Sequence, residues 1–323
     1  MMDSSMSRWF SKIFKDAGIK SIRRKSVLVL LISFVAISLI TSCNQKKETG
    51  YFNQAPPENN VVKFASGIVS LPDRGEYNIS FSKGGDKCYF DGYSRSSSGN
   101  PSKIYYAELV GKSWSEPVEI PSLKNQNFAF YGLSADENSI YLGKDNKIWE
   151  SRLTNGIWGK PELLPEPINS TFGNYGSSET SDGVIYFFSN RPEGTGKTLE
   201  VWRFLPVSGT VENLGAIINA NIRNITPCIA LDGSYIIYSQ SDTNYEYLYI
   251  SFNKGNNEWS EPINMDESGI KINIGTYQNS PSLSHDGKYL FFNSHNSDDE
   301  RLSDIYWVST EVIDSLRLKV LGK

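Results

Sequence analysis

Side chains that could do chemistry recur at a fixed spacing in this 323-residue chain. Five aspartates lie 50, 46, 50 and 54 residues apart, at Asp86, Asp136, Asp182, Asp232 and Asp286. Such a set could hydrolyse a glycosidic bond if two carboxylates converged on one point. Three of the five are followed by glycine between apolar runs, and Asp-Gly in that setting is a strong hairpin signal. We therefore interpret the recurring aspartates as turn residues.

Other catalytic patterns are missing from the sequence. The two histidines, His285 and His295, are not in a metal-spaced pair. The G-x-S-x-G, H-E-x-x-H, phosphate-loop and dinucleotide-binding glycine patterns are all absent. We therefore predict no catalytic residue, no metal site and no cofactor.

A second recurring set of residues is more promising for binding. The first strand of each repeated copy ends at a small residue. Six positions before that residue, the five copies have Glu76, Phe128, Asn174, Asn224 and Gln278. If these strands surround a channel, the set forms a mostly polar ring at one mouth, and we predict that its four polar members bind a ligand. The alternative is that they are solvated residues at the start of a strand. Two irregular loops, at Arg191 and His295, are predicted to supply specificity.

The aspartate turns belong to five copies of one unit, and the clearest copy runs from Ser280 to Ser309. Within it, Pro281–Ser284, Lys288–Ser294 and Asp304–Ser309 are predicted strands. Each copy carries an aliphatic-aromatic pair on its third strand, and three copies then have a Trp-x-x-Pro unit, beginning at Trp114, Trp158 and Trp259. Four strands in about 50 residues is the repeat length of a propeller blade.

The predicted fold is therefore all-β: a five-bladed β-propeller of four-stranded blades over residues 61–315. The last copy ends after three strands, and residues 316–323 are predicted to be a C-terminal tail. The segment Phe64–Leu71 precedes the first copy where a fourth strand precedes the others. We expect this N-terminal strand to complete the last blade and close the ring. A six-bladed ring with one degenerate blade is the alternative.

Residues 1–42 have the features of a lipoprotein signal peptide. Three basic residues, at 23–25, precede the fourteen apolar or small residues Val27–Ile40, a run too short for a membrane span of about 20 residues. The sequence Ile-Thr-Ser-Cys ending at Cys43 resembles the bacterial lipobox, in which the thiol receives a diacylglycerol before cleavage. The alternative is an uncleaved anchor helix with an incidental cysteine. Residues 43–60 are polar, contain two prolines and are predicted to be a flexible tether.

Loss of this leader makes the remaining chain acidic. Residues 1–42 hold seven of the 32 Lys and Arg but two of the 36 Asp and Glu, which leaves 25 basic and 34 acidic residues, a net charge of −9. No basic stripe remains to contact a phosphate backbone, so we expect no nucleic-acid partner. Cys88 and Cys228 fall in different blades, so we expect two buried thiols and no disulfide.

These motifs together resemble the WD-repeat-like β-propellers of the TolB type, especially their Bacteroidetes lipoprotein branch. The likeness covers residues 55–315 and is carried by P-S-L-S-H-D-G-K-Y-L-F-F-N-S at 281–294, D-I-Y-W-V-S at 304–309 and the Trp-Ser-Glu-Pro units. The chain departs from the family at His285, where proline is usual. The resemblance implies an envelope propeller that acts mostly as a binding platform.

The expected function is therefore a non-enzymatic, monomeric module, lipid-anchored to the outer membrane, that binds an envelope protein or glycan. The alternative is a glycoside hydrolase or lyase that acts on polysaccharide through carboxylates at the channel mouth. A third hypothesis is a structural scaffold without a small ligand. Converging carboxylates with perturbed pKa values would favour the enzyme, whereas Asn, Gln and aromatic residues would favour binding.

Overall fold

The computed structural model describes residues 50–96, 102–241, 244–256, 258–296 and 302–322. The predicted signal peptide and Cys43 lie outside these ranges. Within them, strands dominate, and none of the helices has the length and apolar character needed to cross a membrane. The short helices are η1 (Tyr51–Asn53), η2 (Pro121–Leu123), α3 (Gly215–Ile218) and η3 (Met265–Ser268), and a longer helix, α4 (Glu311–Leu321), ends the described chain.

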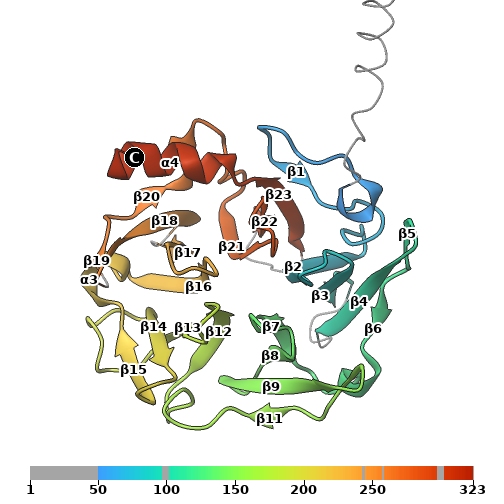
Figure 1. Ribbon diagram of the computed structural model, residues 1–323, viewed down its shortest axis with the longest axis horizontal. Coiled ribbons are helices and arrows are strands. Elements are labelled where there is room, and N and C mark those ends of the chain that lie inside the picture. The colour runs from blue at the N-terminus through green and yellow to red at the C-terminus, as the bar shows by residue number, and fades with distance from the viewer. Residues whose placement is uncertain (1–49, 97–101, 242–243, 257, 297–301, 323) are drawn as a thin grey trace, which may run out of the picture. The chain divides into compact units, whose positions relative to one another are not determined.

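The strands of the described residues form four sheets (Figure 1). We divide the largest sheet at its one parallel pairing, between β18 and β21, and so describe five antiparallel groups of strands. The first group is β2 (Arg74–Phe81), β3 (Lys87–Ser94), β4 (Lys103–Val110), β5 (Ser113–Trp114) and β6 (Val118–Glu119). The second is β7 (Ala129–Leu133), β8 (Ser139–Lys144), β9 (Lys147–Thr154), β10 (Ile157–Trp158) and β11 (Glu162–Leu163). The third is β12 (Asn174–Glu179), β13 (Ile185–Ser189), β14 (Glu200–Leu205) and β15 (Thr210–Asn213).

The fourth and fifth groups are joined by one parallel pairing, between Glu246 and Tyr277. The fourth consists of β16 (Arg223–Ile229), β17 (Tyr235–Ser241), β18 (Glu246–Gly255), β19 (Glu258–Trp259) and β20 (Ile263–Asn264). The fifth consists of β21 (Tyr277–Leu283), β22 (Tyr289–His295), β23 (Asp304–Ser309) and the N-terminal strand β1 (Val62–Lys63).

The first strands of the groups face a common centre (Figure 1). Each contacts the next in cyclic order, from β2 to β7, β12, β16 and β21, and β21 contacts β2 again. This circular arrangement of antiparallel sheets is that of a β-propeller.

The recurring aspartates are turn residues, as the sequence predicted. In the last copy, Ser284 Oγ donates to Asp286 Oδ1 at 2.7 Å, and Gly287 N donates to Ser284 O at 2.9 Å. Gly287 has a φ of 70°, which glycine adopts without steric cost. The first three turns repeat the hydroxyl-carboxylate bond, for example from Thr180 to Asp182 at 2.5 Å, whereas the fourth has Ala230 at the position of the hydroxyl residue.

Apolar clusters between neighbouring groups hold the sheets together. Phe64 and Phe81 pack with Phe291 and Trp307, and so join the first group to the fifth. Trp158 of the second group packs edge-on against Tyr89 of the first, with ring centroids 5.7 Å apart. The two cysteines of the described chain, Cys88 and Cys228, are buried and free, as expected.

The ends of the described chain differ from the sequence prediction. The strand that pairs with β23 is Val62–Lys63, which comes before the predicted strand Phe64–Leu71. Phe64 N still donates a hydrogen bond to Ile305 O, but Ala65 has a φ of 41° and turns the chain away from β23. The predicted flexible tether does not extend to residue 60. Tyr51 stacks on Phe81 at 4.0 Å and Phe52 on Trp114 at 4.3 Å, so these two aromatic residues are part of the core.

Residues 316–321 of the predicted C-terminal tail are instead part of helix α4. Val312, Ile313 and Leu316 are buried against the cluster that contains Phe252 and Leu290. Their spacing places them on one face of the helix, and burial of that face stabilises a helix that is too short to be stable alone. The packed domain therefore extends beyond residue 315.

Candidate functional site

A cavity of about 670 Å³ lies among the first strands of all five groups. Its volume is within the range of about 300–1,000 Å³ typical of small-molecule sites. Residues of β2, β7, β12, β16 and β21 line it, together with the turns that follow β7, β16 and β21 and part of α4. This cavity is the candidate functional site.

A β-bulge in each first strand shapes the wall of the cavity. The register shifts fall between Glu76 and Ile79, Phe130 and Gly132, Tyr175 and Ser178, Ile225 and Cys228, and Asn279 and Ser282. A bulge leaves residues without a partner on the next strand and redirects their side chains. The residues inside the five bulges all line the cavity: Tyr77, Asn78, Tyr131, Gly176, Ser177, Thr226, Pro227, Ser280 and Pro281. We call these nine residues the bulge band.

Three residues of the bulge band have a left-handed backbone. Gly176 has a φ of 60°, while Thr226 and Ser280 have a φ of 49°. This conformation suits glycine, but a β-branched residue rarely adopts it, and such strain costs about 1–3 kcal/mol per residue. Thr226 Oγ1 accepts a hydrogen bond from Ser280 N at 3.2 Å and lies 3.0 Å from Ser239 Oγ. These contacts hold both strained residues in place.

Second strands fix the bulge band through buried polar side chains. Asp91 on β3 accepts hydrogen bonds from Asn78 N at 2.8 Å and from Phe130 N, in the next group, at 3.2 Å. Burial raises the pKa of Asp91 to about 6, although these N–H donors oppose the shift. Asn293 on β22 likewise donates to Tyr77 O at 3.1 Å, so the wall is continuous between the fifth and first groups.

Three serines of the cavity wall have hydroxyls that find no partner among the described residues. The Oγ atoms of Ser177, Ser280 and Ser282 are buried and make no hydrogen bond within the described residues. Ser177 and Ser280 are 8% and 5% exposed. Most buried polar atoms in folded proteins are hydrogen-bonded. Three residues that line one cavity therefore carry a hydroxyl whose hydrogen-bonding capacity is unused by the described residues.

Carboxylates line the end of the cavity formed by the turns. Glu179 Oε2 accepts hydrogen bonds from Ala135 N at 3.0 Å and from the Tyr141 hydroxyl at 3.2 Å. Burial raises the pKa of Glu179, and these two donors oppose the shift. Glu137 accepts from Lys83 N, and Asp286 accepts from Ser284 Oγ in its own turn. These carboxylates hold turns and join neighbouring groups.

The predicted polar ring does not line this cavity. Glu76, Asn174, Asn224 and Gln278 are all fully buried, and Phe128 packs against Trp149. Each polar member bonds within its own group, as Asn224 does by donating to Asn221 O at 2.8 Å and Gln278 by donating to Ser294 Oγ at 3.3 Å. The ring residues come before the bulges in their strands, so their side chains lie on the side of the strand that faces away from the cavity. Their ligand-binding role stays an untested prediction, and the proposals below depend on other residues.

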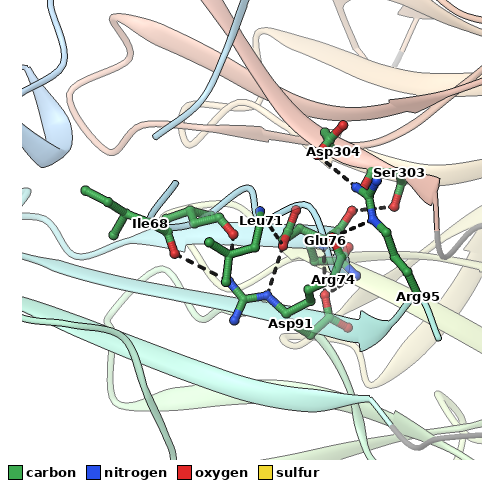
Figure 2. Close-up of polar contacts among 10 residues, drawn as sticks. Ile68, Leu71, Arg74, Glu76, Asp91, Arg95, Ser303 and Asp304 are labelled. Atoms are coloured by element: carbon green, nitrogen blue, oxygen red, sulfur yellow. Dashed lines mark hydrogen bonds and ion pairs between the residues drawn. The ribbon is translucent and has the colours of Figure 1, made fainter. Parts of the chain in front are cut away.

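Glu76 is the member of the predicted ring whose buried contacts are drawn in Figure 2. Its Oε1 accepts hydrogen bonds from Arg74 Nε at 2.9 Å and Leu71 N at 3.4 Å, while Oε2 has no hydrogen-bond partner within the described residues. Burial raises the pKa of Glu76 to about 8, against the opposing effect of Arg74. Beside it, Ser303 Oγ donates to Glu76 O at 2.6 Å. Glu76 therefore belongs to the joint between β2 and the last group.

The two predicted specificity residues are also buried. Arg191 is 8% exposed, donates to Asn174 Oδ1 at 2.8 Å and to Ile168 O, and has its pKa lowered to about 10 by burial. His295 is the last residue of β22, is 6% exposed and stacks on Tyr277 with ring centroids 5.1 Å apart. Arg191 lies in the loop between β13 and β14, as predicted, whereas His295 belongs to β22 and not to a loop. Neither residue lines the cavity, and their role in specificity stays an untested prediction.

Sequence reasoning missed the bulge band, although a local signal for it exists. Proline lacks the N–H that a central strand needs, so Pro227 and Pro281 in the middle of first strands indicate bulges. Gly132 and Gly176 at corresponding places give the same indication. These four residues indicate bulges in four of the five first strands, and β2 has no such residue in its bulge.

Comparisons with known proteins support the fold. No family model matches this chain, and no curated protein matches it. A solved glycoside hydrolase has a TM-score of 0.52 and 13% identity, over 79% of this chain and 91% of that one. TolB from Acinetobacter baumannii has a TM-score of 0.45 and 17% identity, over 73% of this chain and 54% of that one, so the chain matches about half the length of that TolB. These likenesses concern the fold alone, and they do not separate a binding protein from an enzyme.

Proposed function

We propose that this protein is a non-enzymatic binding module of the bacterial cell envelope and that its ligand occupies the central cavity. The observation that carries the proposal is the bulge band, because all five groups contribute to one wall of a cavity of about 670 Å³. Bulges are common next to functional sites, where they redirect side chains. The strain at Thr226 and Ser280 fits the same interpretation, because strained backbone is concentrated at such sites.

The carboxylates of the cavity support binding more than hydrolysis. Glu137 and Glu179 each accept a backbone N–H from the preceding group, and Asp232 and Asp286 each accept one within their own turns. A glycosidase needs two carboxyl groups that flank the scissile bond. Carboxylates that hold turns and joints are less suited to that role.

A glycoside hydrolase or lyase is the second candidate function, and Glu179 is the observation that favours it. This carboxyl group lines the cavity and has a raised pKa, as a general acid requires. Degradation of polysaccharides by the wild-type protein, lost in Glu179→Gln, would establish the enzyme and overturn the binding proposal.

Finer features of the proposal concern architecture and location. We infer five four-stranded blades and a ring closed by β1, on the basis of the cyclic contacts and the β1–β23 pairing. The lipobox-like sequence at Cys43 supports a lipid anchor in the outer membrane and a place in the Bacteroidetes lipoprotein branch. The proposed partner is an envelope protein or glycan, bound by a monomeric domain, and the acidic charge argues against nucleic acid.

Crosslinked capture from the native envelope tests whether the cavity is the binding site. Ser282→Tyr places a large side chain in the cavity wall, and Ser208→Tyr makes the same change at an exposed turn between β14 and β15. We expect the wild-type protein and Ser208→Tyr to capture the same protein or glycan and Ser282→Tyr to lose it. Circular dichroism and thermal unfolding check that both variants fold. Equal capture by both folded variants would overturn the cavity as the binding site.

A further inference from the structure

We propose that the cavity binds a neutral ligand rich in hydroxyl groups, with the chemistry of a sugar. This inference rests on the proposed function and adds the class of the ligand. Three properties of the wall carry it: serine hydroxyls without partners among the described residues, absence of charge in the bulge band, and aromatic residues in the same wall.

The first property is the set of three serine hydroxyls. Ser177 on β12 and Ser280 and Ser282 on β21 each present a buried Oγ that has no hydrogen-bond partner within the described residues. A hydroxyl can donate one hydrogen bond and accept two. A sugar hydroxyl has the same capacity, so it can pair with a serine in either direction. Leaving a buried hydroxyl unpaired costs about 1–3 kcal/mol. Because each Oγ is buried in the ligand-free structure, the serine side chain must rotate toward the cavity before a ligand can pair with it and recover that cost.

The second property is the charge distribution. Every residue of the bulge band is uncharged, whereas the carboxylates that line the cavity, such as Glu137, Glu179 and Asp286, follow at the turns. Arg223 and Arg317 also line the cavity, but the five carboxylates of Glu137, Glu179, Asp232, Asp286 and Asp314 outnumber them, which disfavours an anionic ligand. No group of three or more histidine, cysteine or acidic side chains suited to a metal ion occurs in the described part of the chain. A neutral ligand fits the bulge band best.

The third property is the aromatic lining. Tyr77, Tyr131 and Phe188 line the same cavity as the serines. Aromatic rings offer apolar faces beside polar groups. A sugar ring has the matching character, because its C–H face is apolar and its rim carries hydroxyls. Serines and aromatic residues together can therefore hold both parts of one sugar.

The backbone strain contributes to the placement of one hydroxyl. Thr226 and Ser280 both adopt a φ of 49°, and the hydrogen bond from Ser280 N to Thr226 Oγ1 at 3.2 Å links them. This arrangement leaves Ser280 Oγ without a partner among the described residues, while the N–H of Ser280 is hydrogen-bonded. Backbone strain and an unpaired polar group both lower the stability of the fold. Their presence at the same residue is typical of a binding site.

Titration calorimetry with neutral saccharides tests the ligand class. The probes are glucose, N-acetylglucosamine and their β-1,4-linked oligomers of two to four units, with inorganic phosphate as the charged comparison. We expect a saccharide to bind and phosphate not to bind. Affinity that rises with oligomer length would identify the end of a glycan chain as the ligand, whereas equal affinity for the monosaccharide would identify a free sugar.

Matched serine variants connect this binding to the proposed hydroxyls. Ser177→Ala and Ser282→Ala each remove one cavity hydroxyl, and we expect each to weaken binding about 3- to 10-fold. Ser70→Ala and Ser241→Ala are the controls, because their hydroxyls are also buried without a partner but do not line the cavity. The controls should bind as the wild type does. Neither kind of variant loses a protein hydrogen bond, so we expect all four to fold.

Two outcomes would overturn the inference. If no neutral saccharide binds, or if the cavity variants and the controls bind a saccharide equally, the ligand is not held by these hydroxyls. The capture experiment with Ser282→Tyr is independent of the saccharide probes. Capture that still depends on the cavity, without saccharide binding, would reject the ligand class and keep the proposed function.

Discussion

Glu76 should make the stability of this propeller fall as the pH rises from about 5 to 8. The carboxyl group is fully buried, and burial raises its pKa from 4.5 to about 8. The folded protein therefore binds the proton of Glu76 more tightly than the unfolded chain does. Such a group stabilises the fold most at a pH below the pKa that it has in the unfolded chain. Its contribution is lost as the pH rises through the pKa that it has in the folded protein.

The size of the effect follows from the shift. Each pKa unit corresponds to about 1.4 kcal/mol, so the free energy of unfolding should fall by about 2–3 kcal/mol between pH 5 and pH 7 because of this one group. Glu76→Gln keeps the shape and removes the titration. Arg74 would lose its ion pair but would keep its hydrogen bond to Val69 O at 2.6 Å and its contact with the Tyr105 ring at 4.5 Å. We therefore expect the variant to be more stable than the wild type by about 1–2 kcal/mol at pH 7.

Urea unfolding, followed by tryptophan fluorescence at pH 5, 6, 7 and 8, measures this difference. The stability of Glu76→Gln relative to the wild type should increase steadily with pH, and the exposed Glu116→Gln should show no such trend. A difference that stays constant from pH 5 to pH 8 would refute the reasoning. It would mean that Arg74 keeps Glu76 ionised in the folded protein throughout this range.

Three further predictions concern the packed C-terminus, the strained backbone and the anchor. Leu316→Ala should cost about 2–5 kcal/mol because Leu316 is fully buried on α4, and Leu318→Ala, at a position that is 60% exposed, should change stability by less than about 0.5 kcal/mol in the same urea assay. Ser280→Gly should stabilise the ligand-free protein by about 0.5–1 kcal/mol, because glycine accepts a φ of 49°; a loss of stability on urea unfolding would contradict this. Cys43→Ser should abolish incorporation of labelled fatty acid and release the protein from membranes; unchanged labelling would show that Cys43 is not the lipidated residue.

The repeat and its turns could be predicted because their chemistry is local. Asp286 and Gly287 specify a turn whatever surrounds them, and the same is true of the copy at Asp232 and Gly233. The closing strand was misplaced because Val62–Lys63 is two residues long and lacks a pattern of its own. Tyr51 and Phe52 were assigned to a tether because their neighbours are polar, and only the Trp114 and Phe81 rings across the joint explain their burial.

The candidate site was harder to predict because it depends on register. Counting six residues back from each turn selected Glu76 and its equivalents, but the bulge between this position and the turn changes which side chains face the cavity. A regular alternation cannot reveal such a shift. Pro227 and Pro281 gave a local indication of this shift in register. The burial of Glu76, in contrast, depends on the last group, which is more than two hundred residues away in sequence.

The pairing of Val62 with Trp307 also has a consequence for the order in which the protein can fold. As the chain is synthesised from its N-terminus, β1 must wait without its neighbour until nearly the whole domain has been made. A contact of such long range is slow to form, since closing a long loop has a large entropic cost. Until then, Phe64 and Phe291 lack a complete cluster, so a nascent chain that stops before β23 leaves aromatic surface uncovered. The same pairing that protects the finished ring therefore makes its truncated forms prone to aggregation.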